Sequence, residues 1–256
     1  MEFKKNVFVQ IEKFNWKNFS LAKDIAQKLG NGLYIVLVSF DKEEEEKIRK
    51  EVSKVCPNNK INSFSSFGEA KTFLEDFKPT LVMLSQEKIN PLLHIFKHTD
   101  AEKFIKGLNN FNILLLWEEA EKAEKILINI DYETATEKYI QIAYSFTSKV
   151  AKEFSFIYSF YESFYEHMLM KTHADEEAKQ LVAEMFKEHI LEVKNLLKRA
   201  LGGEDLPLLV IKGDPKKEVP YYSRTHGYDI LIINHSIENK ESYIENTENS
   251  IGIFLD

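Results

Sequence analysis

The fold follows from a stretch near the middle of the chain, Ile126-Leu127-Ile128-Asn129-Ile130-Asp131, which restates an earlier one, Val7-Phe8-Val9-Gln10-Ile11-Glu12. Each is a short apolar run that ends at an acidic residue, and a helical stretch and a second apolar run follow each. The helices are expected at residues 20–29 and 133–152, and the second strands at 33–38 and 154–158. The recurrence, at about half the chain length, predicts one α/β unit written twice.

The composition is that of an ordinary globular protein of 256 residues, with 44% hydrophobic and 29% charged residues. The formal net charge is −7 and the pI about 5.6. An acidic balance argues against broad nucleic-acid binding, which depends on lysine and arginine neutralising phosphates. A single cysteine, Cys56, excludes an intramolecular disulfide and is expected to be a small apolar side chain.

The sequence carries no targeting or membrane signal that we recognise. Its first five residues, Met1-Glu2-Phe3-Lys4-Lys5, lack the long apolar core of a signal peptide. No apolar run approaches the roughly 20 residues of a membrane span. We therefore expect a cytoplasmic protein that neither enters a membrane nor binds nucleic acid.

Short apolar runs and amphipathic stretches alternate along the rest of the chain, which is typical of a parallel sheet with helices on both faces. A polar stretch at residues 118–124 is the expected linker, so we predict domains at 1–120 and 123–256. The fold class is α/β, with two tandem doubly wound domains of about five strands each. Further strands are expected at 60–64, 80–84, 112–117, 208–211, 229–233 and 251–255, and further helices at 41–55, 67–77, 164–201 and 218–226.

Several of these segments resemble the universal stress protein family in its tandem two-domain form. In the second half the resemblance is carried by residues 126–131, by the turn Gly213-Asp214-Pro215 and by the strand Tyr228-Asp229-Ile230-Leu231-Ile232-Ile233. In the first half Glu12 stands where the family has Asp, and Phe67-Gly68-Glu69 is similar to the glycine turn. The resemblance implies five-stranded Rossmann-like domains that pair through their last strands, and a role in stress response.

The resemblance departs from the nucleotide-binding members at one feature, a glycine loop G-x2-G-x9-G-[ST] after the fourth strand. Such glycines let the backbone approach phosphates. Neither half has the loop: residues 85–91 contain no glycine, and neither do residues 234–240. Thr99 stands near the motif's final Ser/Thr position. Few residues separate Asn234 from the last strand, which leaves little room for the usual loop and helix, and the glutamates of this segment would repel phosphates.

Five residues of the second half are the candidate nucleotide-binding residues: Asp131, Gly213, Asn234, His235 and Ser236. The family's Asp contacts adenine, but a carboxylate that caps the following turn explains Asp131 equally well. Gly213 is more simply explained by a tight turn. His235 and Ser236 stand where a ligand would be touched, and loop polarity alone also accounts for them.

The remaining histidines and aromatics favour structural interpretations. His94 and His98 are spaced i, i+4, but the H-E-x-x-H pattern of a zinc site is absent, so we expect no metal. His167 and His173 are expected on a helix surface. An aromatic cluster is expected in the core or at a domain interface, with an apolar ligand pocket as the alternative. Its members are Phe154, Phe156, Phe160, Tyr158, Tyr161, Phe164 and Tyr165.

The sequence therefore predicts a non-enzymatic universal stress protein with a binding or regulatory role, degenerate nucleotide loops and no catalytic residues. No cofactor is expected, and ATP or AMP is the ligand that the resemblance implies if a site is functional. One alternative is an adenine-nucleotide binder or slow ATPase that uses the carboxyl edge of the second domain. Another is a partner-binding scaffold that uses the long helix at 164–201. A protein partner or self-association is compatible with each.

Overall fold

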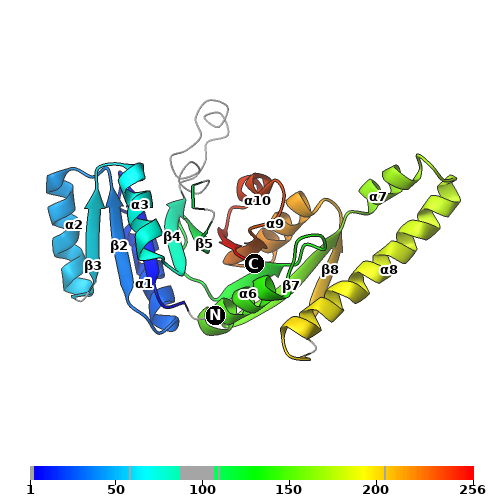
Figure 1. The fold of residues 1–256 in the computed structure, drawn as a ribbon, viewed down its shortest axis with the longest axis horizontal. Helices are drawn as coiled ribbons and strands as arrows, with labels where there is room; N and C mark the ends of the chain where they lie inside the picture. Colours follow the sequence, from blue (N-terminus) through cyan, green and yellow to red (C-terminus); the bar gives the residue numbers. More distant parts are fainter. Residues whose placement is uncertain (1–2, 58, 87–106, 109, 205) are drawn as a thin grey trace.

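A single mixed sheet of ten strands runs through the molecule (Figure 1). The computed structural model describes residues 3–57, 59–86, 107–108, 110–204 and 206–256. The strand order is β3-β2-β1-β4-β5-β10-β9-β6-β7-β8. The predicted α/β class with a mostly parallel sheet is confirmed, but the strands form one continuous sheet, where two separate sheets were expected.

The two halves of the sheet have the same strand order, with the first strand of each half at its centre. The first half contains β1 (Asn6–Ile11), β2 (Leu33–Val38), β3 (Lys60–Phe64), β4 (Leu81–Gln86) and β5 (Ile113–Trp117). The second contains β6 (Lys125–Asn129), β7 (Glu153–Phe160), β8 (Leu208–Lys212), β9 (Ile230–Asn234) and β10 (Ser250–Phe254). All pairs within a half are parallel.

The halves join where β5 and β10 pair in antiparallel register, with Ile251 opposite Leu115. The last strands of the halves therefore pair, as the resemblance implies. Phe254 on β10 is fully buried, and its ring lies 5.2 Å from Phe146 and 6.1 Å from Phe3 between centroids. Because Phe3 belongs to the first half, the apolar cores of the two halves merge at this junction.

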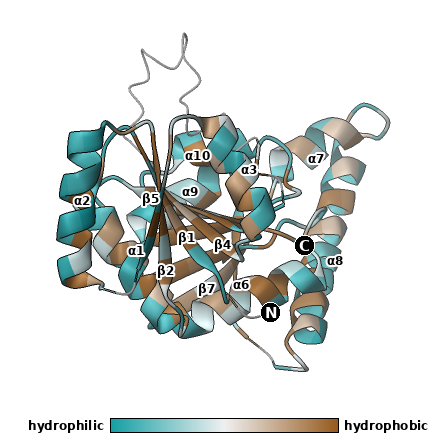
Figure 2. Ribbon diagram, turned by 60° about the vertical axis from the view of Figure 1, so that its left-hand side comes forward, coloured by the Kyte–Doolittle hydropathy of each residue, from teal (hydrophilic) through white to brown (hydrophobic). Residues whose placement is uncertain are grey.

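Helices cover both faces of the sheet, with apolar strands between them and polar surfaces outward (Figure 2). Helices α1, α2, α6 and α8 bury apolar side chains on one face, and α3, α9 and α10 do so on the other. Their bounds are α1 (Trp16–Lys28), α2 (Lys42–Val55), α3 (Phe67–Phe77), α6 (Glu137–Val150), α7 (Glu162–Leu169), α8 (Asp175–Ala200), α9 (Pro215–Thr225) and α10 (Lys240–Asn246).

The single long helix expected at 164–201 is two helices, α7 and α8, which form a hairpin at one end of the molecule (Figure 1). The chain turns at residues 170–174, where the backbone N–H groups of Thr172 and His173 both donate to the carbonyl of Leu169. The buried face of α8 includes Val182, His189, Val193 and Leu197.

Three more boundaries differ from expectation because capping side chains set the helix starts. Asn15 caps α1 and Asp214 caps α9, so both helices begin earlier than apolar spacing indicates. Thr136 caps α6, which begins later. The seven-residue helix α10 fits between β9 and β10, so the expectation of too little room there was wrong. Among the described residues, no helix is long and apolar enough to cross a membrane.

Candidate functional site

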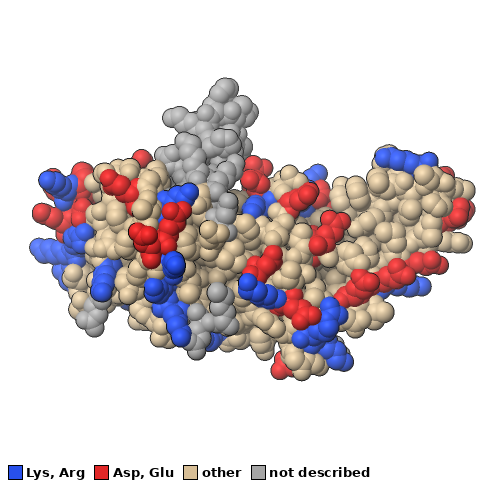
Figure 3. Space-filling model, viewed as in Figure 1, with Lys and Arg blue, Asp and Glu red and all other residues tan. Residues whose placement is uncertain are grey.

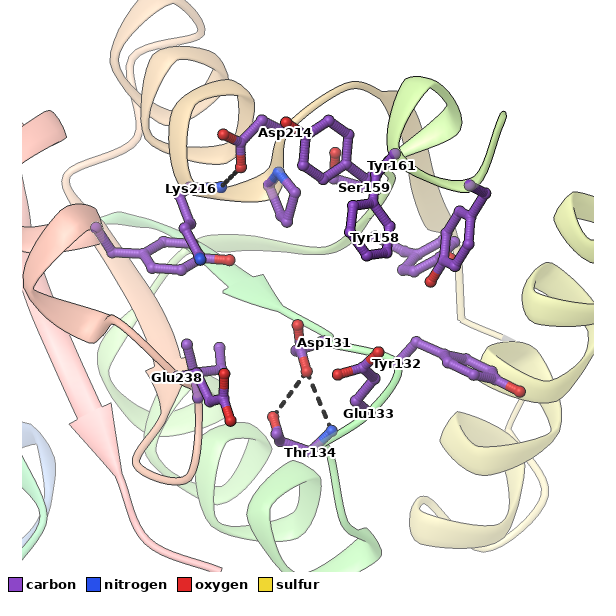
Figure 4. A pocket seen from close by; sticks show the side chains of 15 residues that line it. Asp131, Tyr132, Glu133, Thr134, Tyr158, Ser159, Tyr161, Asp214, Lys216 and Glu238 are labelled. Atoms are coloured by element: carbon purple, nitrogen blue, oxygen red, sulfur yellow. Dashed lines mark hydrogen bonds between the residues drawn. The ribbon is translucent and has the colours of Figure 1, made fainter. Parts of the chain in front are cut away.

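A cavity of about 330 Å³ opens at the carboxyl ends of β6 and β7 (Figure 4). Ligands of doubly wound sheets bind at this edge. The walls come from the loop after β6, the end of β7 with the start of α7, the first turn of α9, the loop after β9, and α10. The lining residues are Asp131, Tyr132, Glu133, Thr134, Tyr158, Ser159, Tyr161, Phe164, Tyr165, Asp214, Pro215, Lys216, Ile237, Glu238 and Tyr243.

Asp131 lines the cavity and also shapes the loop that it begins. Its Oδ1 accepts hydrogen bonds from the backbone N–H of Thr134 (3.1 Å) and from the Thr134 hydroxyl (2.9 Å). The carbonyl of Thr134 in turn accepts from the Nδ2 of Asn234, at 2.6 Å. The carboxylate is half-buried and therefore both closes a turn and presents charge to the cavity.

Gly213 serves the turn between β8 and α9. Its φ is +124°, and a Cβ atom there would lie 2.7 Å from Cγ of Glu218. Its carbonyl accepts from the Ser159 hydroxyl at 2.9 Å, which ties the turn to β7. Gly213 itself does not line the cavity, but the next three residues, 214–216, do. The glycine therefore places α9 and its first turn against the cavity.

The segment Asn234-His235-Ser236 lies beside the cavity rather than in its wall. Asn234 is fully buried and bonds to both neighbouring loops, accepting from the backbone N–H of Ser236 at 2.8 Å. The Ser236 hydroxyl donates to Asp256, at 2.7 Å. Burial lowers the pKa of His235, and the charge of Lys240 lowers it further. The next two residues, Ile237 and Glu238, line the cavity instead.

The aromatic cluster divides between the two roles expected for it. Phe156 and Phe160 are fully buried in the core, and Phe154 packs against it. The other members line the cavity: Tyr158, Tyr161, Phe164 and Tyr165. The four β7 members, Phe154, Phe156, Tyr158 and Phe160, are two residues apart and share one face of the strand. Because Tyr158 lies at the cavity end of that face and α7 begins directly after β7, this one segment supplies both the core and the wall.

His189 lies behind this wall and was not among the predicted site residues. It stands on α8, is 7% exposed, and its Nδ1 lies 2.9 Å from the Tyr158 hydroxyl. The ring of Tyr132 stacks on it at 3.7 Å, and the Tyr132 hydroxyl donates to Glu192. Burial lowers the pKa of His189, although nearby glutamates oppose the shift. The signal that the sequence offered for this residue was a single histidine among apolar residues on one face of the helix.

The charges around the cavity are mostly negative. Four carboxylates line it, and Lys216 is the cation among the described lining residues. Asp214 accepts from the backbone N–H of Lys216 at 3.1 Å, as the cap of α9. The described residues contain no group of three metal-ligating side chains placed to share an ion. The four carboxylates are Asp131, Glu133, Asp214 and Glu238.

At the corresponding edge of the first half, the described polar side chains bond to one another and to the backbone. Gln10, 1% exposed, donates from Nε2 to the Ser85 hydroxyl at 2.6 Å and accepts at Oε1 from the backbone N–H of Asn15 at 2.6 Å. Glu12, the counterpart of Asp131, has a left-handed backbone with φ of 54°. The predictions for His94, His98, Thr99 and most of the loop at 85–91 lie outside the described residues.

Comparison with protein families and with curated proteins found no match to this sequence. Solved structures share the fold. A functionally unknown protein, PA1789, from Pseudomonas aeruginosa PAO1 superposes with a TM-score of 0.71 at 13% identity, covering 99% of this chain and 93% of that one. A putative universal stress protein from Pseudomonas aeruginosa UCBPP-PA14 gives 0.70 at 12% identity, with 99% and 94% coverage.

A universal stress protein from Archaeoglobus fulgidus DSM 4304 gives a TM-score of 0.55 at 10% identity, with 98% and 96% coverage. At such identities the likeness shows the fold alone. The chain therefore has a universal-stress-protein-like α/β fold over nearly its whole length.

Proposed function

We propose that this chain is a cytoplasmic, non-enzymatic binding and regulatory protein of the universal stress type, made of tandem domains at 1–120 and 123–256. It senses a small molecule at the cavity of its second half and does not bind ATP in the family's usual way. Its nucleotide loops are degenerate, and its response is a change in stability or surface rather than turnover of the ligand.

The observation that carries this proposal is the set of charges in the cavity. A nucleotide polyphosphate needs backbone N–H groups and cations around its phosphates. Here the loop after β9 brings Glu238 to the cavity, and residues 234–249 contain no glycine. Four carboxylates face one lysine, so the field in the cavity opposes a polyanion.

Titration of the full chain with ATP, ADP and AMP, with and without Mg²⁺, tests this proposal. A ligand that binds the native state but not the unfolded chain stabilises it by RT ln(1 + [L]/Kd) and so raises the unfolding temperature. We expect no saturable shift and no calorimetric signal at millimolar nucleotide, and no release of phosphate from ATP. The matched variant is Asp131→Asn, which keeps an oxygen acceptor for Thr134 while removing the charge.

A saturable shift with ATP that Asp131→Asn weakens would contradict the proposal. Such a result would make the chain an adenine-nucleotide binder, and phosphate release would make it a slow ATPase.

A second candidate function, a partner-binding scaffold, is favoured by the α7–α8 hairpin. All eight residues of α7 are described, and none of them is buried. Phe164 and Met168 are 48% and 49% exposed, and Met170 just beyond is 40% exposed. Phe164 and Met168 are four residues apart and so share a helix face. Exposed apolar side chains on one face are typical of interaction surfaces.

Self-association tests the scaffold function first, by sedimentation velocity of the full chain over a hundred-fold range of concentration. If the hairpin mediates association, a Met168→Ser/Met170→Ser variant is expected to sediment as a monomer where the parent does not. Leu191→Ser, an exposed apolar residue elsewhere on α8, is the matched control. Equal behaviour of the parent and both variants would exclude the hairpin from self-association.

A further inference from the structure

Six aromatic side chains wall the cavity, more than a sugar or phosphate requires. Five of them come from the loop after β6 and from β7 with α7, and the sixth comes from α10. Neighbouring rings touch: Phe164 lies 5.5 Å from Tyr165 and 5.7 Å from Tyr161 between centroids. A ring presents partial negative charge on its face and attracts a cation placed there. The six are Tyr132, Tyr158, Tyr161, Phe164, Tyr165 and Tyr243.

The carboxylates add full charges to the same space. Asp131, Glu133 and Thr134 lie on one side of the cavity, with Ser159 and Tyr161 across from them (Figure 4). Within the part of the chain that the structure describes, none of the four carboxylates forms an ion pair with lysine or arginine. Asp131 and Asp214 accept hydrogen bonds from their own loops, so the charges of Glu133 and Glu238 are the ones left for whatever enters the cavity.

The rings and the carboxylates act on the same volume. Burial raises the pKa of the Tyr158 and Tyr165 hydroxyls, and the charges of Asp131 and Glu133 raise both further. These two tyrosines therefore stay neutral, and they lie within the electrostatic reach of both carboxylates. The cavity combines neutral aromatic faces with unpaired negative charge, two independent features that attract the same kind of group.

We propose that this cavity binds a small organic cation, an ammonium group that carries apolar substituents. The substituents contact the rings, and the charge is balanced by Glu133 and Glu238 at the mouth, both of which are exposed. A volume of about 330 Å³ suits a ligand of this size. The inference rests on the proposed function, since it names the ligand class of the same site.

Choline and tetramethylammonium are the probes, and 3,3-dimethylbutan-1-ol is the control because it has the shape of choline without the charge. Calorimetry and thermal shift on the full chain are expected to show saturable binding of both cations. The neutral alcohol at equal concentration is expected to give no shift, since it gains neither ring nor carboxylate attraction.

Variants separate the two kinds of contact. Glu133→Gln/Glu238→Gln is expected to weaken choline binding about ten-fold, because a lost charge contact is worth on the order of one factor of ten. Phe164→Leu, at an exposed ring, is expected to weaken it several-fold without unfolding the protein. Glu43→Gln/Glu46→Gln on α2 removes the same charge far from the cavity and is expected to leave binding unchanged.

Equal binding of choline and the neutral alcohol would overturn the inference, because the cavity would then be merely apolar. So would the absence of binding by either cation, or a shift with Ca²⁺ that choline does not displace. The nucleotide titration tests the proposed function separately from the ligand class. Saturable ATP binding would contradict the proposed function. If the cations alone fail to bind, the proposed function is unaffected and only its ligand class is wrong.

Discussion

The two halves of the molecule share one strand order but differ in what lies between their second and third strands. In the first half this is α2, which buries just two of its fourteen residues, Ile48 and Val52. In the second half it is the α7–α8 hairpin, in which α8 alone buries six residues. The hairpin also supplies Phe164 and Tyr165 to the cavity. The halves share the order of their strands, and the segment in which they differ supplies part of the cavity wall.

The same comparison holds at the carboxyl edges. In the first half, the buried Gln10 bonds to Ser85 and to the backbone of Asn15, so its own polar groups are satisfied within the protein. In the second half, the corresponding strand ends in a buried Asn129, and Asp131 faces a cavity. A fold fixes where a ligand can sit, and the side chains at that edge decide whether one does.

The largest expected effect tests whether the two halves of the molecule unfold independently. Phe254→Ala removes a fully buried ring at the junction and is expected to cost about 3–5 kcal/mol of unfolding free energy. Both tryptophans, Trp16 and Trp117, lie in the first half. Because Phe3 packs on Phe254, we expect the urea midpoint to move equally by tryptophan fluorescence and by circular dichroism. An unmoved fluorescence midpoint would mean that the halves unfold independently.

The glycines of the two similar turns, Gly213 in the second half and Gly68 in the first, should differ next. Gly213→Ala forces an L-residue into φ of +124° against Glu218, and we expect a loss of about 1–3 kcal/mol. Gly68 lies inside α3, where an added Cβ would meet the Ser66 hydroxyl at 3.9 Å, an ordinary contact, so Gly68→Ala is expected to gain up to about 1 kcal/mol from helix propensity. Urea denaturation of the two variants measures both. Equal effects would contradict the view that only the second half kept a strained glycine turn.

The free energy of unfolding should depend on pH through His189, which lies in the second half. Burial lowers its folded pKa, so near and below pH 6.5 the unfolded chain binds more protons and stability falls as pH falls. We expect His189→Gln to reduce the difference in unfolding free energy between pH 7.5 and pH 5.5, by up to about 1 kcal/mol. Burial also lowers the pKa of His235, so it changes the unfolding free energy with pH in the same direction. His235 is still present in the His189→Gln variant, so part of the pH dependence should remain.

The control for this measurement is His226→Gln, which replaces an exposed histidine at the end of α9. It is expected to leave the pH dependence as it is in the parent. If it flattens the profile as much as His189→Gln does, the buried histidine is not the source.

The smallest effects are expected at surface charges, which are spread over both halves (Figure 3). Lys212 on β8 contacts Glu162 of α7 at 2.6 Å, and Lys17 contacts Glu119 in the first half at the same distance. Exposed pairs contribute little, so Lys212→Met should cost about 0.2–1 kcal/mol and Lys17→Met should leave the stability nearly unchanged. Thermal unfolding at low and high salt checks this. A loss above about 2 kcal/mol for Lys212→Met would show that the hairpin is held by charge rather than by α8 packing.

The strands could be predicted to within about two residues, because buried parallel strands are nearly continuous apolar runs. The turn between α7 and α8 could not be predicted, since residues 170–174 contain neither glycine nor proline. Asp131 was found because it follows the first strand of its half, two residues after the strand ends. The sequence did not indicate three other lining residues, Lys216, Glu238 and Tyr243. Their place in the cavity depends on how α9, α10 and the loops pack across the sheet.

The antiparallel pairing of β5 with β10 has one more consequence. All strands of the first half run with β5 and all strands of the second run with β10, so the strands of the two halves point in opposite directions. The sheet therefore reverses its direction once, at the junction of the two halves.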